Sequence, residues 1–312
     1  MSAKTHAPGR AADPALSEIL SRYIDGKLSA PVTLMQLLIE TENADVVRDV
    51  VRDFAESAPN STAQRRATDL QHLMQTNRAG CERIAAMLRA DVDSSEPART
   101  VEEGIAFCER LFDWSVQQSE EASVALYSLG NPDLLEQATA EIVLQLRRWN
   151  LLTNATSVLD IGCGIGRLLV GLAPHVRRAV GIDVSAEMVK AAQRRCEGHE
   201  NVSVFKGDGH GLGAVADDQF DLIVAVDSFP YLRQSGHALV QTFVADSARA
   251  LKSGGQLVIL NYSYSENDET DAREIRDLAA KNGLEVLEVG VRPFKLWDGV
   301  AFRLRTGVRT EA

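Results

Sequence analysis

One short segment of the chain combines glycines and an acid at a spacing that could bind a ligand. Residues 158–166 read Val-Leu-Asp-Ile-Gly-Cys-Gly-Ile-Gly, so Asp160 is followed by Gly162, Gly164 and Gly166 at every second position. Glycines leave the backbone N–H groups of a turn uncovered, and a helix that begins after such a turn directs further N–H groups to the same place. The segment therefore predicts a ligand-binding loop with an acid in the strand before it.

Three further aspartates each end an apolar segment. Asp183 stands roughly 20 residues after Asp160, the interval that separates a glycine loop from a ribose-binding acid in doubly wound folds. Asp208, which Gly209 follows, and Asp227 end the next two apolar segments. If these segments are parallel strands, the acids lie at the edge of a sheet where such folds bind ligands.

Apolar runs and helical patterns alternate through the second half of the chain. The runs that predict strands are 158–161, 180–185, 202–209 and 220–227, and a turn with a fifth strand is predicted within 251–260. The patterns that predict helices are 165–174, 185–197, 237–252 and 272–282. Two alternating segments, 284–289 and 300–304, predict further strands near the C-terminus. Five strands that alternate with helices indicate a parallel sheet.

The motifs of residues 127–312 resemble, in type and order, those of the class I S-adenosylmethionine (SAM)-dependent methyltransferases. Asp-x-Gly-x-Gly-x-Gly at 160–166 is similar to the first motif of that family. The resemblance implies a Rossmann-like α/β fold, a doubly wound and mostly parallel seven-stranded sheet that ends in an antiparallel hairpin, with SAM as the cofactor. An NAD-linked dehydrogenase is the nearest competitor by fold, but Asp160 inside the glycine motif and the pair Asp208-Gly209 favour SAM.

The resemblance also implies which residues contact the cofactor. They are Tyr127, Asp160, Gly162, Gly164, Gly166, Asp183, Val184, Asp208, Gly209 and Asp227. The glycines would approach the methionine moiety, and Asp160 would support its amino group. Asp183 would hold the ribose hydroxyls, Asp208 would accept the adenine amino N–H, and Asp227 would lie beside the reactive methyl group. Tyr127 is placed here by a hypothesis that residues 127–131 form part of a lid, and ordinary packing is its alternative.

Acceptor-side candidates follow the fourth and fifth strands, where open α/β sheets bind ligands. The catalytic candidates are Asp227, Tyr231, His237 and Tyr262, with Ser228, Asn261 and Tyr264 nearby in the sequence. A base is needed if the acceptor is a hydroxyl or a protonated amine. The period of two predicts that Tyr262 and Tyr264 share one side of an extended segment. Packing at a strand end stays an alternative for each tyrosine, and His237 is expected to begin or cap a helix.

The function that the resemblance implies is in-line methyl transfer from the sulfonium to a nitrogen or oxygen of a small molecule. Biosynthesis of a specialised metabolite is preferred over primary metabolism. Two other functions stay open. One is an enzyme that moves the aminopropyl chain of SAM or cyclises SAM and releases methylthioadenosine. The other is a SAM-binding partner protein that has no turnover.

The first part of the chain differs from the rest because helical patterns dominate it. Residues 1–95 are expected to be an all-helical region that acts as a lid or a dimerisation surface, and 96–312 the SAM-binding domain. Within that domain, the helices of 100–150 lead into the sheet. Helix starts are predicted at Asp13-Pro14, at the capping box Thr100-x-x-Glu103 and at Asn131-Pro132, with one helix across 65–88 and a linker at 91–98.

Composition limits the partners and the compartment. The chain has 312 residues and a formal net charge of −11, which disfavours binding to nucleic acid. Four cysteines without close spacing predict reduced thiols, and no metal-binding motif stands in the sequence. No apolar run approaches the ~18 residues of a membrane span. We expect a cytoplasmic protein with a small-molecule substrate, no metal, no membrane partner, and the possibility of a homodimer.

Overall fold

The chain divides into two compact units. The computed structural model describes residues 13–58, 60–90, 99–265 and 267–307, and the predicted linker 91–98 lies outside them. The first unit comprises residues 1–91, 125–135 and 295–298. The second comprises residues 92–124, 136–294 and 299–312. The first unit thus takes in two ranges from beyond the predicted helical region.

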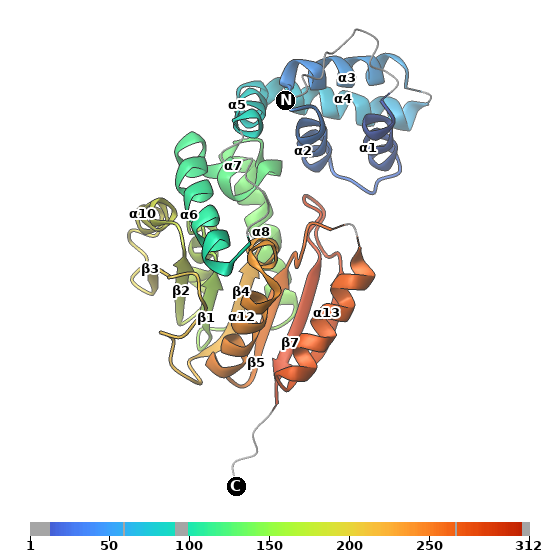
Figure 1. Ribbon diagram of the computed structural model, residues 1–312. Coiled ribbons are helices and arrows are strands. Elements are labelled where there is room, and N and C mark those ends of the chain that lie inside the picture. The colour runs from blue at the N-terminus through green and yellow to red at the C-terminus, as the bar shows by residue number, and fades with distance from the viewer. Residues whose placement is uncertain (1–12, 59, 91–98, 266, 308–312) are drawn as a thin grey trace. The chain divides into compact units, whose positions relative to one another are not determined.

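A seven-stranded sheet forms the centre of the second unit, in the order β3-β2-β1-β4-β5-β7-β6 (Figure 1). The strands are β1 Ser157–Ile161, β2 Arg178–Asp183, β3 Val202–Lys206, β4 Phe220–Val226, β5 Leu251–Leu260, β6 Leu284–Val291 and β7 Ala301–Thr306. The first five pair in parallel, whereas β7 runs antiparallel to both β5 and β6. The predicted fold class is confirmed. The strand order reverses between β1 and β4, which makes the carboxyl ends of these strands the expected ligand site.

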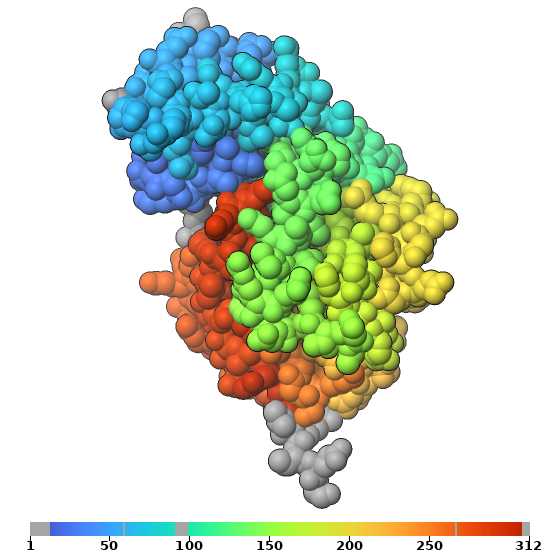
Figure 2. Space-filling model, turned by 180° about the vertical axis from the view of Figure 1, so that it is seen from behind, coloured from blue at the N-terminus to red at the C-terminus, as the bar shows by residue number. Residues whose placement is uncertain are grey.

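Helices cover both faces of this sheet because its central strands are apolar on both sides. The helices that follow the strands are α9 Arg167–Leu172, α10 Ala186–Arg195, α11 Phe229–Ser235, α12 His237–Ala250 and α13 Asp268–Lys281, with a short 3-10 turn at Ala173–His175. Buried residues of α12 and α13 share one hydrophobic core with β4, β5 and β7 (Figure 1). The other face carries α8, Pro132–Arg148, drawn in green in Figure 2. Just after α8, the ring of Trp149 lies 4.7 Å from the guanidinium carbon of Arg303 on β7.

Two helices of the second unit precede the sheet, α6 Val101–Gln118 and α7 Glu120–Val124. The predicted start of α6 is confirmed, because the Glu103 backbone N–H donates to Thr100 Oγ1 at 3.2 Å. The Glu103 carboxylate accepts from the Arg99 N–H at 2.8 Å, one residue before the cap. Asn131 likewise caps α8, since its Oδ1 accepts from the Asp133 N–H at 2.8 Å.

The first unit is helical. Its helices are α1 Pro14–Ile24, α2 Ala30–Thr41, α3 Ala44–Glu56, α4 Ser61–Thr76 and α5 Arg78–Arg89, with a 3-10 turn η2 at Leu126–Ser128. The predicted start of α1 is confirmed by the Ala15 N–H, which donates to Asp13 Oδ1 at 3.0 Å. Ser29, Asn43 and Asn60 cap α2, α3 and α4 in the same way.

The single helix predicted across 65–88 is wrong, because Asn77 divides it into α4 and α5. Asn77 leaves the helical region with φ −109° and ψ 23°. Its Nδ2 donates to the Leu73 carbonyl at 2.9 Å, and its Oδ1 accepts from Asn131 Nδ2 at 2.7 Å. These side-chain bonds compete with the helical backbone, and a periodicity argument does not see them.

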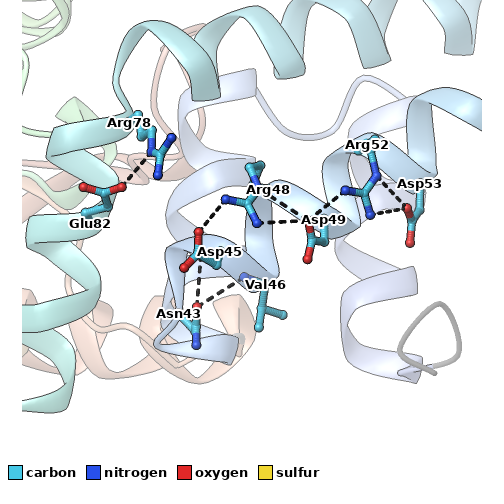
Figure 3. Close-up of polar contacts among 9 residues, drawn as sticks. All are labelled: Asn43, Asp45, Val46, Arg48, Asp49, Arg52, Asp53, Arg78 and Glu82. Carbon is cyan, nitrogen blue, oxygen red and sulfur yellow. Dashed lines mark hydrogen bonds and ion pairs between the residues drawn. The ribbon is translucent and has the colours of Figure 1, made fainter. Parts of the chain in front are cut away.

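An exposed row of charges runs along α3 (Figure 3). Arg48 bonds to Asp45 and Asp49, and Arg52 bonds to Asp49 and Asp53. Exposed pairs of this kind contribute about 0–1 kcal/mol each, so packing of the opposite face does more to hold α3 in place. Among the described residues, no helix is long and apolar enough to cross a membrane.

Candidate active site

Three neighbouring strands end in residues with left-handed backbone angles. Gly162 after β1 has φ 69°, Asp227 after β4 has φ 57°, and Asn261 after β5 has φ 64°. Such angles are free for glycine, whereas for most other residues they cost on the order of 1–3 kcal/mol and gather at functional sites. The chain thus turns sharply at one edge of three adjacent strands, where the predicted site lies.

The glycine loop is packed too closely for side chains. A Cβ atom on Gly162 would lie 2.6 Å from Ser228 Cβ, and one on Gly164 would lie 2.6 Å from Val124 Cγ1. Gly166, with φ 75°, stands at the N-cap of α9. Ser228 Oγ is buried beside this loop without a hydrogen-bond partner among the described residues. A buried polar atom of this kind fits a loop that receives a polar ligand.

Asp183 joins the glycine loop to the end of β2. Its Oδ2 accepts from the Gly164 N–H at 2.8 Å, and its Oδ1 accepts from the Ser185 N–H at 2.9 Å. Burial raises the pKa of Asp183 above its ordinary value, although these backbone N–H groups and that of Val184 oppose the shift. A carboxylate has about four acceptor positions, so Asp183 has capacity for ribose hydroxyls as well.

Asp160 is a buried acid at the centre of the sheet, with 2% of its surface exposed. Burial raises the pKa of Asp160 to about 8, the Arg167 guanidinium lowers it, and Asp183 raises it further. A buried carboxylate is costly unless a cation pairs with it. The amino group of a methionine moiety is such a cation, so the acid fits the predicted cofactor.

The loop after β3 holds the predicted adenine contacts. Asp208 is exposed, and its Oδ1 accepts from the His210 N–H at 2.9 Å, which fixes a turn. Gly209 has φ 81°, and a Cβ atom there would lie 2.6 Å from Ile105 Cγ2 and 3.2 Å from Val184 Cγ2. Ile105 on α6 and Val184 after β2 therefore border the backbone of Gly209.

Helix α6 borders the site on two sides, which the sequence did not indicate. Asp113 Oδ1 accepts from Ser185 Oγ at 2.5 Å and from the Glu187 N–H at 3.0 Å, at the start of α10. On the other side, a Cβ atom on Gly104 would lie 2.5 Å from Ser235 Cβ of α11. Ile105 and Asp113 were missed because the sequence shows only an amphipathic helix, without a motif that marks either residue.

Asp227 and Asn261, which the sequence places on the acceptor side, contact each other. Asn261 Nδ2 donates to Asp227 Oδ1 at 2.7 Å, while Asn261 Oδ1 accepts from the Val300 N–H at 2.8 Å. The Tyr264 hydroxyl donates to the same Asp227 oxygen at 3.5 Å, a long contact. The side chains predicted after strands four and five thus meet at Asp227.

Tyr231 lies between two other rings. Its ring centroid is 4.8 Å from that of Phe112 and 6.1 Å from that of Tyr264, with near-perpendicular planes in both pairs. Burial, and next the charge of Asp227, raise the pKa of Tyr231 to about 12. The Tyr231 hydroxyl therefore stays protonated at neutral pH and can donate a hydrogen bond.

Tyr262 and His237 lie apart from this group. Tyr262 is fully buried in the core, and its hydroxyl donates to Glu274 Oε2 at 3.0 Å, whereas Tyr264 is 55% exposed. The prediction that the two tyrosines share one side of an extended segment is wrong, because the chain bends at Tyr262 and again at Tyr264 instead of staying extended. His237 is exposed and begins α12, as expected. The surroundings of Tyr262 favour packing over catalysis.

Tyr127 belongs to the first unit, where it lies in η2 and stacks on Trp297 with ring centroids 5.6 Å apart. Its contact with the cofactor stays a prediction. The described residues contain no group of three or more His, Cys, Asp or Glu side chains that could hold a metal ion. The four cysteines, all of them described, are buried free thiols.

The sheet order, the glycine loop at its switch point and the acid after β2 define a Rossmann-like nucleotide-binding fold. Comparison with known proteins extends this result. Residues 158–255 match a family model described as a methyltransferase domain. The uncharacterized methyltransferase YcgJ of Bacillus subtilis is 31% identical over 118 residues, which cover 36% of this chain and 44% of that protein.

Two further similarities agree with this match. Demethylmenaquinone methyltransferase of Tropheryma whipplei is 33% identical over 112 residues, which again cover 36% of this chain and 44% of that protein. A solved structure of Haemonchus contortus phosphoethanolamine N-methyltransferase 1 with S-adenosylhomocysteine superposes with a TM-score of 0.51 and 17% identity. It covers 68% of this chain and 51% of the other, and at this identity it shows the fold alone.

The chain thus carries a methyltransferase domain on a Rossmann-like fold of the SAM-dependent kind, and SAM is the cofactor that this domain implies. It spans less than half the length of the two curated relatives described above.

Proposed function

We propose that this chain transfers the methyl group of SAM to a nitrogen or oxygen atom of a small molecule. The observation that carries the proposal is the carboxylate of Asp227, which Asn261 holds at 2.7 Å on the same sheet edge as the glycine loop. A substrate that is methylated at an N–H or O–H group must lose a proton, and a carboxylate held at that place can take it.

The residues that would hold the cofactor fit its parts. The glycine loop turns tightly at the switch point of the sheet, Asp160 contributes a buried carboxyl group that the amino group would pair with, and Asp183 has acceptor capacity for the ribose. SAM supplies an activated methyl group, because the sulfur that leaves is already a sulfonium. The protein therefore does not need to activate the leaving group.

The task that remains for the chain is to orient the acceptor and exclude water. Orientation can lower a barrier by about 7–11 kcal/mol in favourable cases. Val124 and Ser228 pack against the glycine loop, and Tyr231 is packed between two rings. Asp227 would take the proton of the acceptor, and Asn261 would keep its carboxylate in place.

A small molecule is the acceptor that composition favours. The net charge of −11 repels the phosphates of nucleic acid. One relative is named demethylmenaquinone methyltransferase, which agrees with a small-molecule acceptor. The assignment of a specialised metabolite rather than a primary one rests on the acidic composition and the added helices.

Mass spectrometry of the full-length protein with SAM, alone and with a metabolite extract, tests the proposal. We expect S-adenosylhomocysteine only in the presence of extract, together with one metabolite that has gained a methyl group. Methylthioadenosine would instead indicate aminopropyl transfer or cyclisation of SAM, and would contradict the proposal. Binding of SAM without any product would favour a non-catalytic partner protein.

A further inference from the structure

Three aromatic rings from three different elements form a corner beside Asp227. Phe112 comes from α6, Tyr231 from α11, and Tyr264 from the segment after β5. The planes of Phe112 and Tyr231 meet at 74°, and those of Tyr231 and Tyr264 at 86°. Near-perpendicular rings of this kind are the walls of the aromatic cages that bind ammonium groups.

The carboxylate at this corner has a fixed orientation. The amide oxygen of Asn261 accepts from the Val300 N–H, so its NH₂ group must point to Asp227. Both Asp227 and Asn261 hold left-handed backbone angles, which are strained and gather where function requires them. The strands thus hold a charge of defined sign and position beside these rings.

We propose that the acceptor is an amine, which this corner binds as an ammonium ion through Asp227 and through the faces of Tyr231 and Tyr264. The inference rests on the proposed methyl transfer and narrows its acceptor from nitrogen or oxygen to an amine nitrogen. A carboxylate and aromatic faces both attract a cation, and both disfavour an anionic acceptor. A neutral hydroxyl would gain one hydrogen bond here but no charge attraction.

The same groups complete the reaction without a further reactant. The ammonium loses one proton to the Asp227 carboxylate, and its nitrogen lone pair then forms the new bond to the methyl carbon. The carbon–sulfur bond breaks, and its electron pair stays on sulfur, which becomes a neutral thioether. Asp227 later returns its proton to water. The high pKa of Tyr231 keeps that hydroxyl from competing for the proton.

Binding of uncharged and charged probes tests the proposal without turnover. The full-length protein, saturated with S-adenosylhomocysteine, is titrated with 2-phenylethylamine, 2-phenylethanol and phenylacetate by calorimetry or ligand-observed NMR. We expect the amine to bind at least about tenfold more tightly than the alcohol, since it adds a hydrogen bond between charged groups. Equal affinities, or no binding of the amine, overturn the proposal.

Matched variants test whether the preference for the amine over the alcohol comes from Asp227 and the aromatic rings beside it. Asp227→Asn, which keeps the shape and tolerates the left-handed angle, should remove the preference of the amine over the alcohol. Tyr264→Leu removes a ring and should weaken amine binding about 2- to 30-fold, whereas Tyr264→Phe, which keeps the ring, should weaken it less. Tyr264 is largely exposed, so neither change at this position disturbs a buried core. An unchanged preference in Asp227→Asn overturns the proposal.

The rings could instead hold the sulfonium of SAM, and one comparison separates the two roles. If they do, Tyr264→Leu weakens binding of SAM more than binding of S-adenosylhomocysteine, which lacks the charge. We expect both affinities to change equally. A selective loss of SAM affinity assigns the corner to the cofactor and overturns the proposal.

Fractionation of the extract separates failure of this inference from failure of methyl transfer itself. A metabolite extract is divided by ion exchange into cationic, neutral and anionic fractions and incubated with SAM that carries a deuterated methyl group. A labelled amine from the cationic fraction supports the proposal. A labelled product from the other fractions alone contradicts the amine but leaves methyl transfer intact. No S-adenosylhomocysteine from any fraction contradicts both.

Discussion

At the scale of single residues, several groups of the predicted site lower the stability of the folded chain. Asp160 is buried in a strand with its pKa raised to about 8, and Asp227 and Asn261 hold left-handed backbone angles. Strained or costly groups of this kind gather at functional sites, which supports the roles proposed for these residues toward a cationic or polar ligand. We therefore expect some substitutions here to stabilise the fold and abolish binding.

Asp160→Asn is the first such case. The pKa of Asp160 is about 8 in the folded chain, against roughly 3.9 in an unfolded one. The folded state thus binds the proton more tightly, and the acid costs stability that grows between about pH 4 and pH 8 by up to ~1.4 kcal/mol per pH unit. Asparagine has no charge to bury, so the variant should unfold at a higher temperature than the parent, with a gap that widens from pH 5.5 to pH 8.

Calorimetry across this pH range checks the widening, and SAM binding is measured on the same samples. We expect the variant to lose SAM affinity, because asparagine has no carboxylate to pair with the amino group of the cofactor. A gap that is constant with pH would mean that Asp160 does not titrate in this range. Full SAM affinity in the variant would remove Asp160 from the cofactor site.

Asp183→Ala should weaken SAM binding by about 2–4 kcal/mol, because two hydrogen bonds to a charged acceptor are lost. The change also removes the acceptor for the Gly164 and Ser185 N–H groups, so loss of loop order adds to the effect. Calorimetric titration with SAM measures it. The control is Asp277→Ala, an exposed acid on α13, which should bind SAM as the parent does. Affinity of the Asp183 variant within twofold of the parent would show that the ribose site is misassigned.

The acids of the site were predictable for a simple physical reason. Parallel strands end at one edge of a sheet, so Asp183, Asp208 and Asp227 could be placed there from the ends of apolar runs alone. Asp113 could not, because nothing in its own helix marks it. It acts through a bond to Ser185, and that pairing depends on how two helices pack.

At the scale of elements, α6 connects the two sides of the site. It contacts the start of α10 through Asp113 and the end of α11 through Gly104. A second charged residue of the same helix, Glu109, makes an ion pair of 2.9 Å with Lys206 in which both side chains are more than a third exposed. Substitutions at Asp113 and Glu109 can therefore distinguish the contribution of α6 packing from that of its surface charge.

Asp113→Ala should lower the free energy of unfolding by about 1–3 kcal/mol, because Ser185 Oγ and the Glu187 N–H lose their acceptor at a helix N-terminus. Glu109→Ala should lower it by at most about 1 kcal/mol, as for other exposed pairs. Urea unfolding measures both. Equal effects of the two substitutions would argue against a docking role for Asp113.

The elements themselves were largely predictable, and the failures have local causes. Apolar runs located the five parallel strands, because buried strands read as apolar segments, and alternating segments located β6 and β7. The break at Asn77 escaped prediction since it depends on Asn131, which lies far away in the sequence. The opposite environments of Tyr262 and Tyr264 escaped it because the period of two holds only while a chain stays extended.

At the scale of the whole molecule, the first unit is assembled from distant parts of the sequence. Ser29 Oγ donates to the Leu296 carbonyl, Tyr127 stacks on Trp297, and Asn77 bonds to Asn131. A cut at the end of the N-terminal helices would therefore leave residues 125–135 and 295–298 without the partners that they pack against. Sequence patterns find continuous segments, so the assembly of this unit was not predictable.

Gly80→Ala tests whether this assembly is tight. Alanine is the better helix former in α5 by about 1 kcal/mol, so propensity alone predicts a gain in stability. The added Cβ atom, however, would lie 1.8 Å from the backbone oxygen of Leu129, a contact that only a shift of the backbone relieves. We expect the free energy of unfolding to fall by about 1–3 kcal/mol, as for other overpacked sites.

Gly213→Ala is the matched control, because a Cβ atom there meets nothing within 4 Å. Denaturant unfolding of both variants gives the comparison. A Gly80 variant as stable as the parent would mean that residues 125–135 are not held against α5 in solution.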